Sequence, residues 1–137
     1  MNSERASIGV EQLVELLSLA PFHRWLGLSI VELDADQLVI AMPWREEIVS
    51  NPMVGAAHGG ILSALIDLTG LYTILAMGGT ARATADMRVD FHRPAMPGLL
   101  FAIGKPVKLG RQISVAEARI VAADNTLLAS GRGAYVA

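Results

Sequence analysis

Ala57-His58-Gly59-Gly60 opens a nearly all-apolar run that continues as Ile61-Leu62-Ser63-Ala64-Leu65-Ile66-Asp67-Leu68-Thr69-Gly70-Leu71-Tyr72-Thr73-Ile74-Leu75-Ala76-Met77. At about 1.5 Å per residue, the run predicts a helix of about 30 Å, as long as a small domain is wide. A helix that is apolar on all sides is buried in a protein core or in a membrane. Asp67 near the middle, the glycines and the lack of flanking basic residues argue against a membrane span. We therefore expect a core helix, with a membrane span as the alternative.

The overall composition narrows the class of protein. The 137 residues fit one domain, and the 53% hydrophobic and 18% charged residues leave little polar surface. We therefore expect copies of the chain to cover part of one another. The net charge of −2 gives no electrostatic footprint for nucleic acid. The chain contains no cysteine, which excludes disulfides, thiolate metal sites and a cysteine nucleophile.

The sequence also gives expectations about the location of the protein and its cofactors. No basic segment followed by an apolar stretch resembles a secretion signal, so a cytoplasmic location is expected. The three histidines lie far apart and no paired acidic motif accompanies them, so we expect no metal and no cofactor. We expect neither nucleic acid nor membrane as a partner.

The N-terminal residues predict a covering helix. Apolar residues recur with nearly helical spacing from Ser7 to Ala20, and Pro21 is expected to stop this helix. The following Phe22-His23-Arg24-Trp25 is expected to be a turn in which His23 is structural. This gives residues 1–21 as a covering helix and residues 22–137 as a single domain.

Strands are predicted on both sides of the long helix. Two before it flank the turn formers Asp34-Ala35-Asp36, and the following Trp44–Ala56 segment is predicted to be a loop. After the Gly78-Gly79 stop, Arg82–His92 alternates strictly between polar and apolar residues. The predicted strands are 28–33, 37–43, 82–92, 99–108, 112–122 and 126–136. The last four are expected to form an antiparallel meander, which gives an α+β fold of about six strands curved around the helix.

Two features of the long helix point to chemistry. Unpaired backbone N–H groups at a helix N-terminus carry partial positive charge, and Gly59 and Gly60 leave room for a carbonyl that becomes an oxyanion. The alternative is that the glycines only permit a tight turn. Asp67 lies among apolar neighbours, where carboxylates are rare. It is either a reacting group or the acceptor of a structural hydrogen bond.

The spacing of these two features predicts a shared site. Gly59 and Asp67 are eight residues apart, which is about 12 Å along a helix, whereas groups acting on one carbon lie within about 3.5 Å of it. Two antiparallel helices could each lend the glycine end to the other's Asp67, giving two equivalent sites per dimer. Ser63 and Gly70 lie near the same helical line and would let two helices approach closely.

One pattern combines the His58-Gly59-Gly60 motif and Asp67 with two later segments, Thr84-Ala85-Asp86-Met87-Arg88-Val89-Asp90-Phe91 and Arg93-Pro94-Ala95. This pattern resembles the hotdog-fold acyl-CoA thioesterases. Within that family, the chain is most similar to the phenylacetate-pathway (PaaI-like) branch, from about Phe22 to the C-terminus. The resemblance implies a helix wrapped in a curved antiparallel sheet and a homodimer with one continuous sheet, commonly paired into a homotetramer. It also implies hydrolysis of an acyl-CoA thioester.

The resemblance also implies roles for individual residues. The Gly59 N–H would polarise the thioester carbonyl, and His58 would shape the turn and contact the site. Asp67 of the opposite subunit would be the nucleophile or the base that activates water. Thr84 matches a hydroxyl position that holds water or the carboxylate. The residues expected to contact substrate are Gly60, Ser63 and Leu68.

Two residues depart from the family pattern. Asn51 is a candidate catalytic residue: many relatives have an asparagine six residues before the histidine, whereas Asn51 stands seven residues before His58. Thr84 falls on the polar phase of its strand, so it reaches the helix only if the strand begins with a bulge or turn there.

Other functions remain as alternatives. A non-catalytic acyl-CoA-binding module would use the same architecture, and a hydratase is disfavoured because no Asp-plus-His pair lies in the segment before the helix. A triad of Ser63, His58 and Asp67 is disfavoured because the nucleophile-elbow pattern is missing. The acyl group, aromatic or medium-chain, stays open. The basic residues available for CoA phosphates are Arg93, Lys105, Lys108, Arg111 and Arg132.

Overall fold

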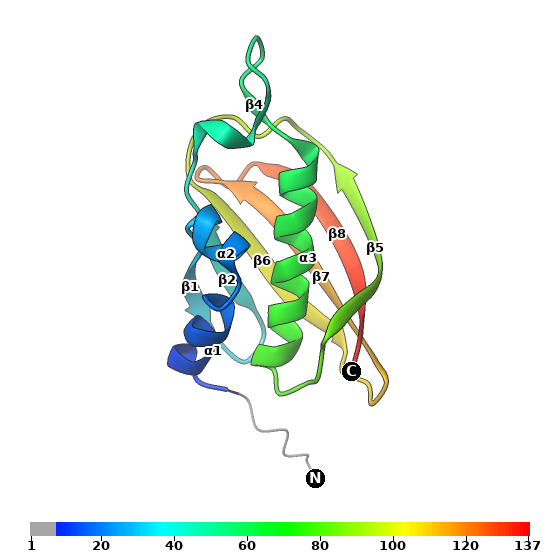
Figure 1. Ribbon diagram of the computed structural model, residues 1–137. Coiled ribbons are helices and arrows are strands. Elements are labelled where there is room, and N and C mark those ends of the chain that lie inside the picture. The colour runs from blue at the N-terminus through cyan, green and yellow to red at the C-terminus, as the bar shows by residue number, and fades with distance from the viewer. Residues whose placement is uncertain (1–7) are drawn as a thin grey trace.

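A computed structural model describes residues 8–137 and shows an antiparallel sheet curved around one long helix (Figure 1). The strands are β1 (Ser29–Leu33), β2 (Leu38–Met42), β5 (Ala83–Phe91), β6 (Leu100–Lys108), β7 (Ile113–Ala122) and β8 (Leu127–Val136). Their order across the six-stranded sheet is β1-β2-β6-β7-β8-β5. This arrangement confirms the predicted α+β hotdog fold.

The central helix, α3 (Gly59–Ala76), lies within the predicted run. His58 is the N-cap residue, and its ring accepts a hydrogen bond from the Gly60 N–H. At the other end, Gly78 adopts a positive φ of 86°, and the N–H groups of Gly78 and Gly79 donate to Leu75 and Ile74. These two bonds form a Schellman motif, which is why the helix ends at the glycine pair.

The buried positions of α3 show why this helix is so apolar. It packs against strands β2, β5, β6, β7 and β8, and its core side chains include Leu62, Leu65 and Ile66. By length and composition α3 would also pass as a membrane span, and half of it is buried inside the fold. A sheet wrapped around the helix accounts for its composition, as expected for a core helix.

The N-terminal region corrects one prediction. Helix α1 (Val10–Leu17) ends before the predicted end at Ala20, and Ser7, the predicted start, lies outside the described residues. Pro21 does not end this helix but begins a second one, α2 (Pro21–Leu26). Proline suits the first helical position because no intrahelical partner exists for its missing N–H. The predicted turn around His23 is therefore helical.

His23 has the structural role that was expected. Its Nδ1–H donates to the Leu17 carbonyl at 2.8 Å, and its ring packs edge-on against Tyr72 of α3. The residue thereby ties α2 to α1 and to the central helix.

The predicted loop before α3 also contains regular structure. A 3-10 turn (Glu46–Ile48) leads into a small hairpin of β3 (Val49–Asn51) and β4 (Ala56–Ala57). The hairpin extends beyond the end of the sheet at the top of Figure 1. Gly55, with a φ of 81°, allows its tight turn.

The connection after β5 was predicted wrongly. β6, β7 and β8 form a meander, but β5 pairs with β8 at one edge of the sheet, and the chain then crosses to β6 beside β2. Alternating residues determine which face of a strand is buried, but they do not determine its neighbour.

Candidate active site

The N-terminus of α3 leaves one backbone donor free. The His58 ring accepts from the Gly60 N–H at 3.0 Å, and the N–H groups of Ile61 and Leu62 donate to the His58 carbonyl. The Gly59 N–H has no acceptor among residues 8–137. Because Nδ1 of His58 accepts, the neutral ring carries its proton on Nε2. The helix end therefore presents the Gly59 N–H, with the positive end of the helix dipole behind it.

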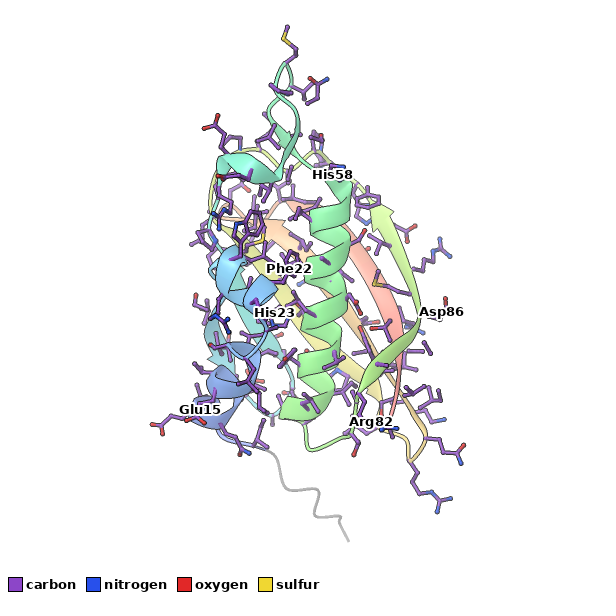
Figure 2. All side chains as sticks on the ribbon, in the orientation of Figure 1. Glu15, Phe22, His23, His58, Arg82 and Asp86 are labelled. Atoms are coloured by element: carbon purple, nitrogen blue, oxygen red, sulfur yellow. The ribbon has the colours of Figure 1, made fainter. Side chains whose placement is uncertain are left out.

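A pocket of about 300 Å³ lies in front of this donor. A Cβ added at Gly59 would lie 3.4 Å from the ring of Phe91, at the end of β5. The lining residues are Ala56, Ala57, Gly59, Leu62, Phe91, His92, Arg93, Pro94 and Ala95. Figure 2 shows His58 at the same end of α3. The pocket is thus mostly apolar, with Arg93 among its lining residues.

Asp67 is held by the predicted threonine. Thr84 Oγ1 donates to Asp67 Oδ1 at 2.6 Å, and Oδ2 has no hydrogen-bond partner among the described residues. The register between β5 and β8 shifts between Thr84 and Asp86, so a bulge begins the strand. This is the bulge that Thr84 needed to reach the helix. Asp67 is half-buried in the single chain. The apolar residues around it in the sequence had indicated a deeper burial.

One chain does not bring Gly59 and Asp67 together. They lie on the same helix and are separated by about 12 Å of helical rise. Each is next to a different part of β5: Gly59 lies by Phe91, and Asp67 lies by Thr84. The two candidate groups therefore lie by opposite ends of one edge strand.

Other predicted site residues are placed elsewhere. The side-chain oxygen of Asn51 accepts the Met53 N–H at 3.0 Å, within the turn of the small hairpin. Leu68 belongs to the core cluster, and Ser63 is half-buried without a hydrogen bond to His58. Gly70 was expected on the line of small residues facing a second helix, but it faces Tyr135 of β8 instead.

Tyr135 is a neighbour of Asp67 that the sequence did not reveal. Its side chain is fully buried, and its hydroxyl donates to the Asp67 backbone carbonyl at 3.1 Å. Burial, with a smaller contribution from the Asp67 charge, holds the pKa of Tyr135 well above its ordinary value, so the hydroxyl remains a donor. The one signal available in the sequence was that Tyr135 is an aromatic residue near the end of a predicted strand that is otherwise rich in small residues.

No group of three or more His, Cys, Asp or Glu side chains is arranged to hold a metal ion within residues 8–137. The site described above therefore consists of a helix terminus, an apolar pocket and a carboxylate with its hydroxyl donor.

The chain is similar to known thioesterase-superfamily proteins in sequence and in fold. The sequence profile of the thioesterase superfamily matches residues 54–129. A solved thioesterase-superfamily protein is 40% identical, with a TM-score of 0.87 over 93% of this chain and 97% of that one. A candidate esterase of Halobacterium salinarum is 32% identical over 81% of this chain and 80% of its own length. The medium/long-chain acyl-CoA thioesterase YigI of Salmonella typhimurium is 23% identical, covering 85% of this chain and 84% of that protein.

The likeness to the phenylacetate branch is one of fold. The PaaI protein of the E. coli phenylacetic acid degradation operon has a TM-score of 0.79 at 23% identity, covering 94% of this chain and 96% of that one. The profile spans more than half of the sequence, and it includes the helix N-terminus, Asp67 and Thr84. The chain therefore belongs to the thioesterase superfamily.

Proposed function

We propose that this protein hydrolyses an acyl-CoA thioester in a site shared by two copies of the chain. The observation that carries the proposal is the free Gly59 N–H at the start of α3. This group is available to donate a hydrogen bond to the carbonyl oxygen of a bound thioester. A donor at this position stabilises the negative charge that develops on that oxygen in the transition state. Asp67, with Oδ2 free, is the group that acts on the thioester carbon from the other side.

The edge strand supports a shared site. Among the described residues β5 pairs only with β8, and its other edge is open. Residues opposite each other in an antiparallel pair lie on the same face of the sheet, so two copies of β5 can pair about an axis at Arg88. Ala85, in the bulge beside Thr84, would then lie opposite Phe91 of the other copy. The Asp67 end of each β5 would then lie beside the Gly59 end of its partner's β5.

The chemistry follows from these groups. With Asp67 as the base, its carboxylate takes a proton from water, and the water oxygen bonds to the thioester carbon. The carbonyl electrons move onto oxygen, where the Gly59 N–H stabilises them. As they return, the carbon–sulfur bond breaks, and CoA leaves as the thiol after taking the proton. With Asp67 as the nucleophile, a carboxylate oxygen bonds to the thioester carbon and the carbon–sulfur bond breaks, which releases CoA as the thiolate and leaves a mixed anhydride. Water then cleaves the anhydride to give the free acid and to restore the carboxylate.

For the substrate, we propose an aryl or medium-chain acyl group, as in the PaaI-like branch. The apolar pocket walls, Leu62 and Phe91, suit either group, and Arg93 offers a cation for CoA phosphate. Support comes from relatives named as a medium/long-chain acyl-CoA thioesterase and as a phenylacetic acid operon protein. The specificity constants of a panel of aryl-CoA and fatty acyl-CoA esters would rank these classes.

The direct test is Asp67→Asn, which keeps the shape of the side chain and removes its basicity. We expect the fold to be preserved and kcat for thiol release to fall by about 10²- to 10⁴-fold. Asp36→Asn is the matched control because Asp36 is an exposed carboxylate in the β1–β2 turn. Unchanged turnover in Asp67→Asn would reject this role. A wild-type protein that binds acyl-CoA without releasing thiol would favour the non-catalytic binding module.

A further inference from the structure

Tyr135 reaches Asp67 through a slot that two glycines leave open. A Cβ at Gly70 of α3 or at Gly133 of β8 would overlap the Tyr135 hydroxyl oxygen. Gly70 lies inside a helix, where a glycine lowers the stability of the protein by about 0.5–1 kcal/mol relative to an alanine. The helix thus has a destabilising glycine, Gly70, at a position where any side chain would displace the Tyr135 hydroxyl.

The hydroxyl binds a carbonyl that already has a partner. Asp67 lies inside α3, so its carbonyl accepts the helical N–H four residues later, and a carbonyl oxygen has a second lone pair for the phenol. The contact therefore does not rescue an orphaned group. Its effect is to fix one turn of the helix, the turn that carries the carboxylate, against β8.

Tyr135 and Thr84 act on the two ends of the same residue. They are directly paired across β8 and β5, because the bulge after Thr84 sets this register. Thr84 holds the Asp67 side chain at 2.6 Å, and Tyr135 holds its main chain at 3.1 Å. Together the two hydroxyls fix both the position of the backbone and the direction of the carboxylate.

We infer that Tyr135 is a positioning residue for Asp67: through the glycine slot, its hydroxyl sets the helix turn from which the carboxylate reaches the thioester. This inference rests on the proposed function. A catalytic group displaced by about 1 Å can cost about 100-fold in rate, so a buried anchor on its backbone affects turnover rather than substrate affinity.

The test is Tyr135→Phe in the full chain, with Tyr72→Phe as the matched control. Tyr72 also donates its phenol to a backbone carbonyl, that of Leu16 at 3.3 Å, and it anchors α1 rather than Asp67. We expect Tyr135→Phe to lower kcat about tenfold with KM within about twofold, whereas Tyr72→Phe leaves both unchanged. Thermal unfolding of the two variants measures the loss of stability separately.

A second measurement asks whether Tyr135 acts through Asp67. In the Asp67→Asn background, adding Tyr135→Phe should change the residual rate by less than about twofold, because the group being positioned no longer reacts. A full tenfold loss in that background, or a full kcat in Tyr135→Phe alone, would overturn the inference while the proposed function stands. A wild-type chain that releases no thiol from any ester would overturn both.

Discussion

At the scale of single residues, burial changes the acidity of both tyrosines in the chain. It raises the pKa of Tyr72 and, with help from the Asp67 charge, that of Tyr135. Above about pH 10 the unfolded chain loses these phenolic protons while the native chain keeps them. Because the native state then binds more protons than the unfolded state, the free energy of unfolding falls as the pH rises.

This linkage predicts an alkaline loss of stability with an assignable origin. The Tyr135 phenol contributes a slope of at most about 1.4 kcal/mol per pH unit above about pH 10. Urea unfolding of the wild type, Tyr135→Phe and Tyr72→Phe between pH 8 and 11 measures it. We expect Tyr135→Phe to flatten the decline more than Tyr72→Phe does. The same pH dependence in Tyr135→Phe as in the wild type would contradict the assignment.

Single residues also show how far the sequence predicts the candidate site. Gly59 and Asp67 follow from local chemistry, since a glycine at a helix start and a carboxylate in an apolar run are visible in the sequence. The contact of Thr84 with the helix could be predicted only on the condition that the strand begins with a bulge, because the bulge decides which face of the sheet Thr84 occupies. Tyr135 was missed because its contact with Asp67 joins residues 68 positions apart.

At the scale of elements, the helix comes close to the sheet because the facing strand positions are small. The inner face of β6 and β8 presents Ala102, Gly104, Ala129, Gly131 and Gly133 to α3. A Cβ at Gly104 would overlap Thr73 Oγ1 and would lie 3.0 Å from Thr69 Cγ2. Small residues in β6 thus set the separation that lets β8 and β5 reach Asp67.

Gly104→Ala should therefore destabilise the fold by about 1–3 kcal/mol, the usual cost of overpacking a core. Urea denaturation would measure this as a lower midpoint with an unchanged slope. In a Thr73→Ala background the overlapping oxygen is gone, so the same glycine substitution should cost less. Equal costs in both backgrounds would show that Thr73 is not the obstacle.

At the scale of the whole molecule, the sequence predicts the architecture better than the connections. Helical and alternating patterns identified the long helix and all six strands of the main sheet within a few residues. They did not predict that β5 crosses from beside β8 to β6, because a pattern does not specify partners that are distant in sequence. The open edge of β5 is a consequence of this connection, and it is where the proposed dimer forms.

A shared site predicts that two inactive variants restore each other. Gly59→Ala places a methyl group beside Phe91 at the mouth of the pocket, so it should block the carbonyl, and Asp67→Asn removes the reacting carboxylate. In a mixed dimer, one site carries both changes and the other carries neither. Random pairing makes half of the dimers mixed, so about one quarter of wild-type activity should return. Thiol release after refolding an equimolar mixture measures this. If the mixture is no more active than the average of the two variants, each chain contains its own complete site and the dimeric site is wrong.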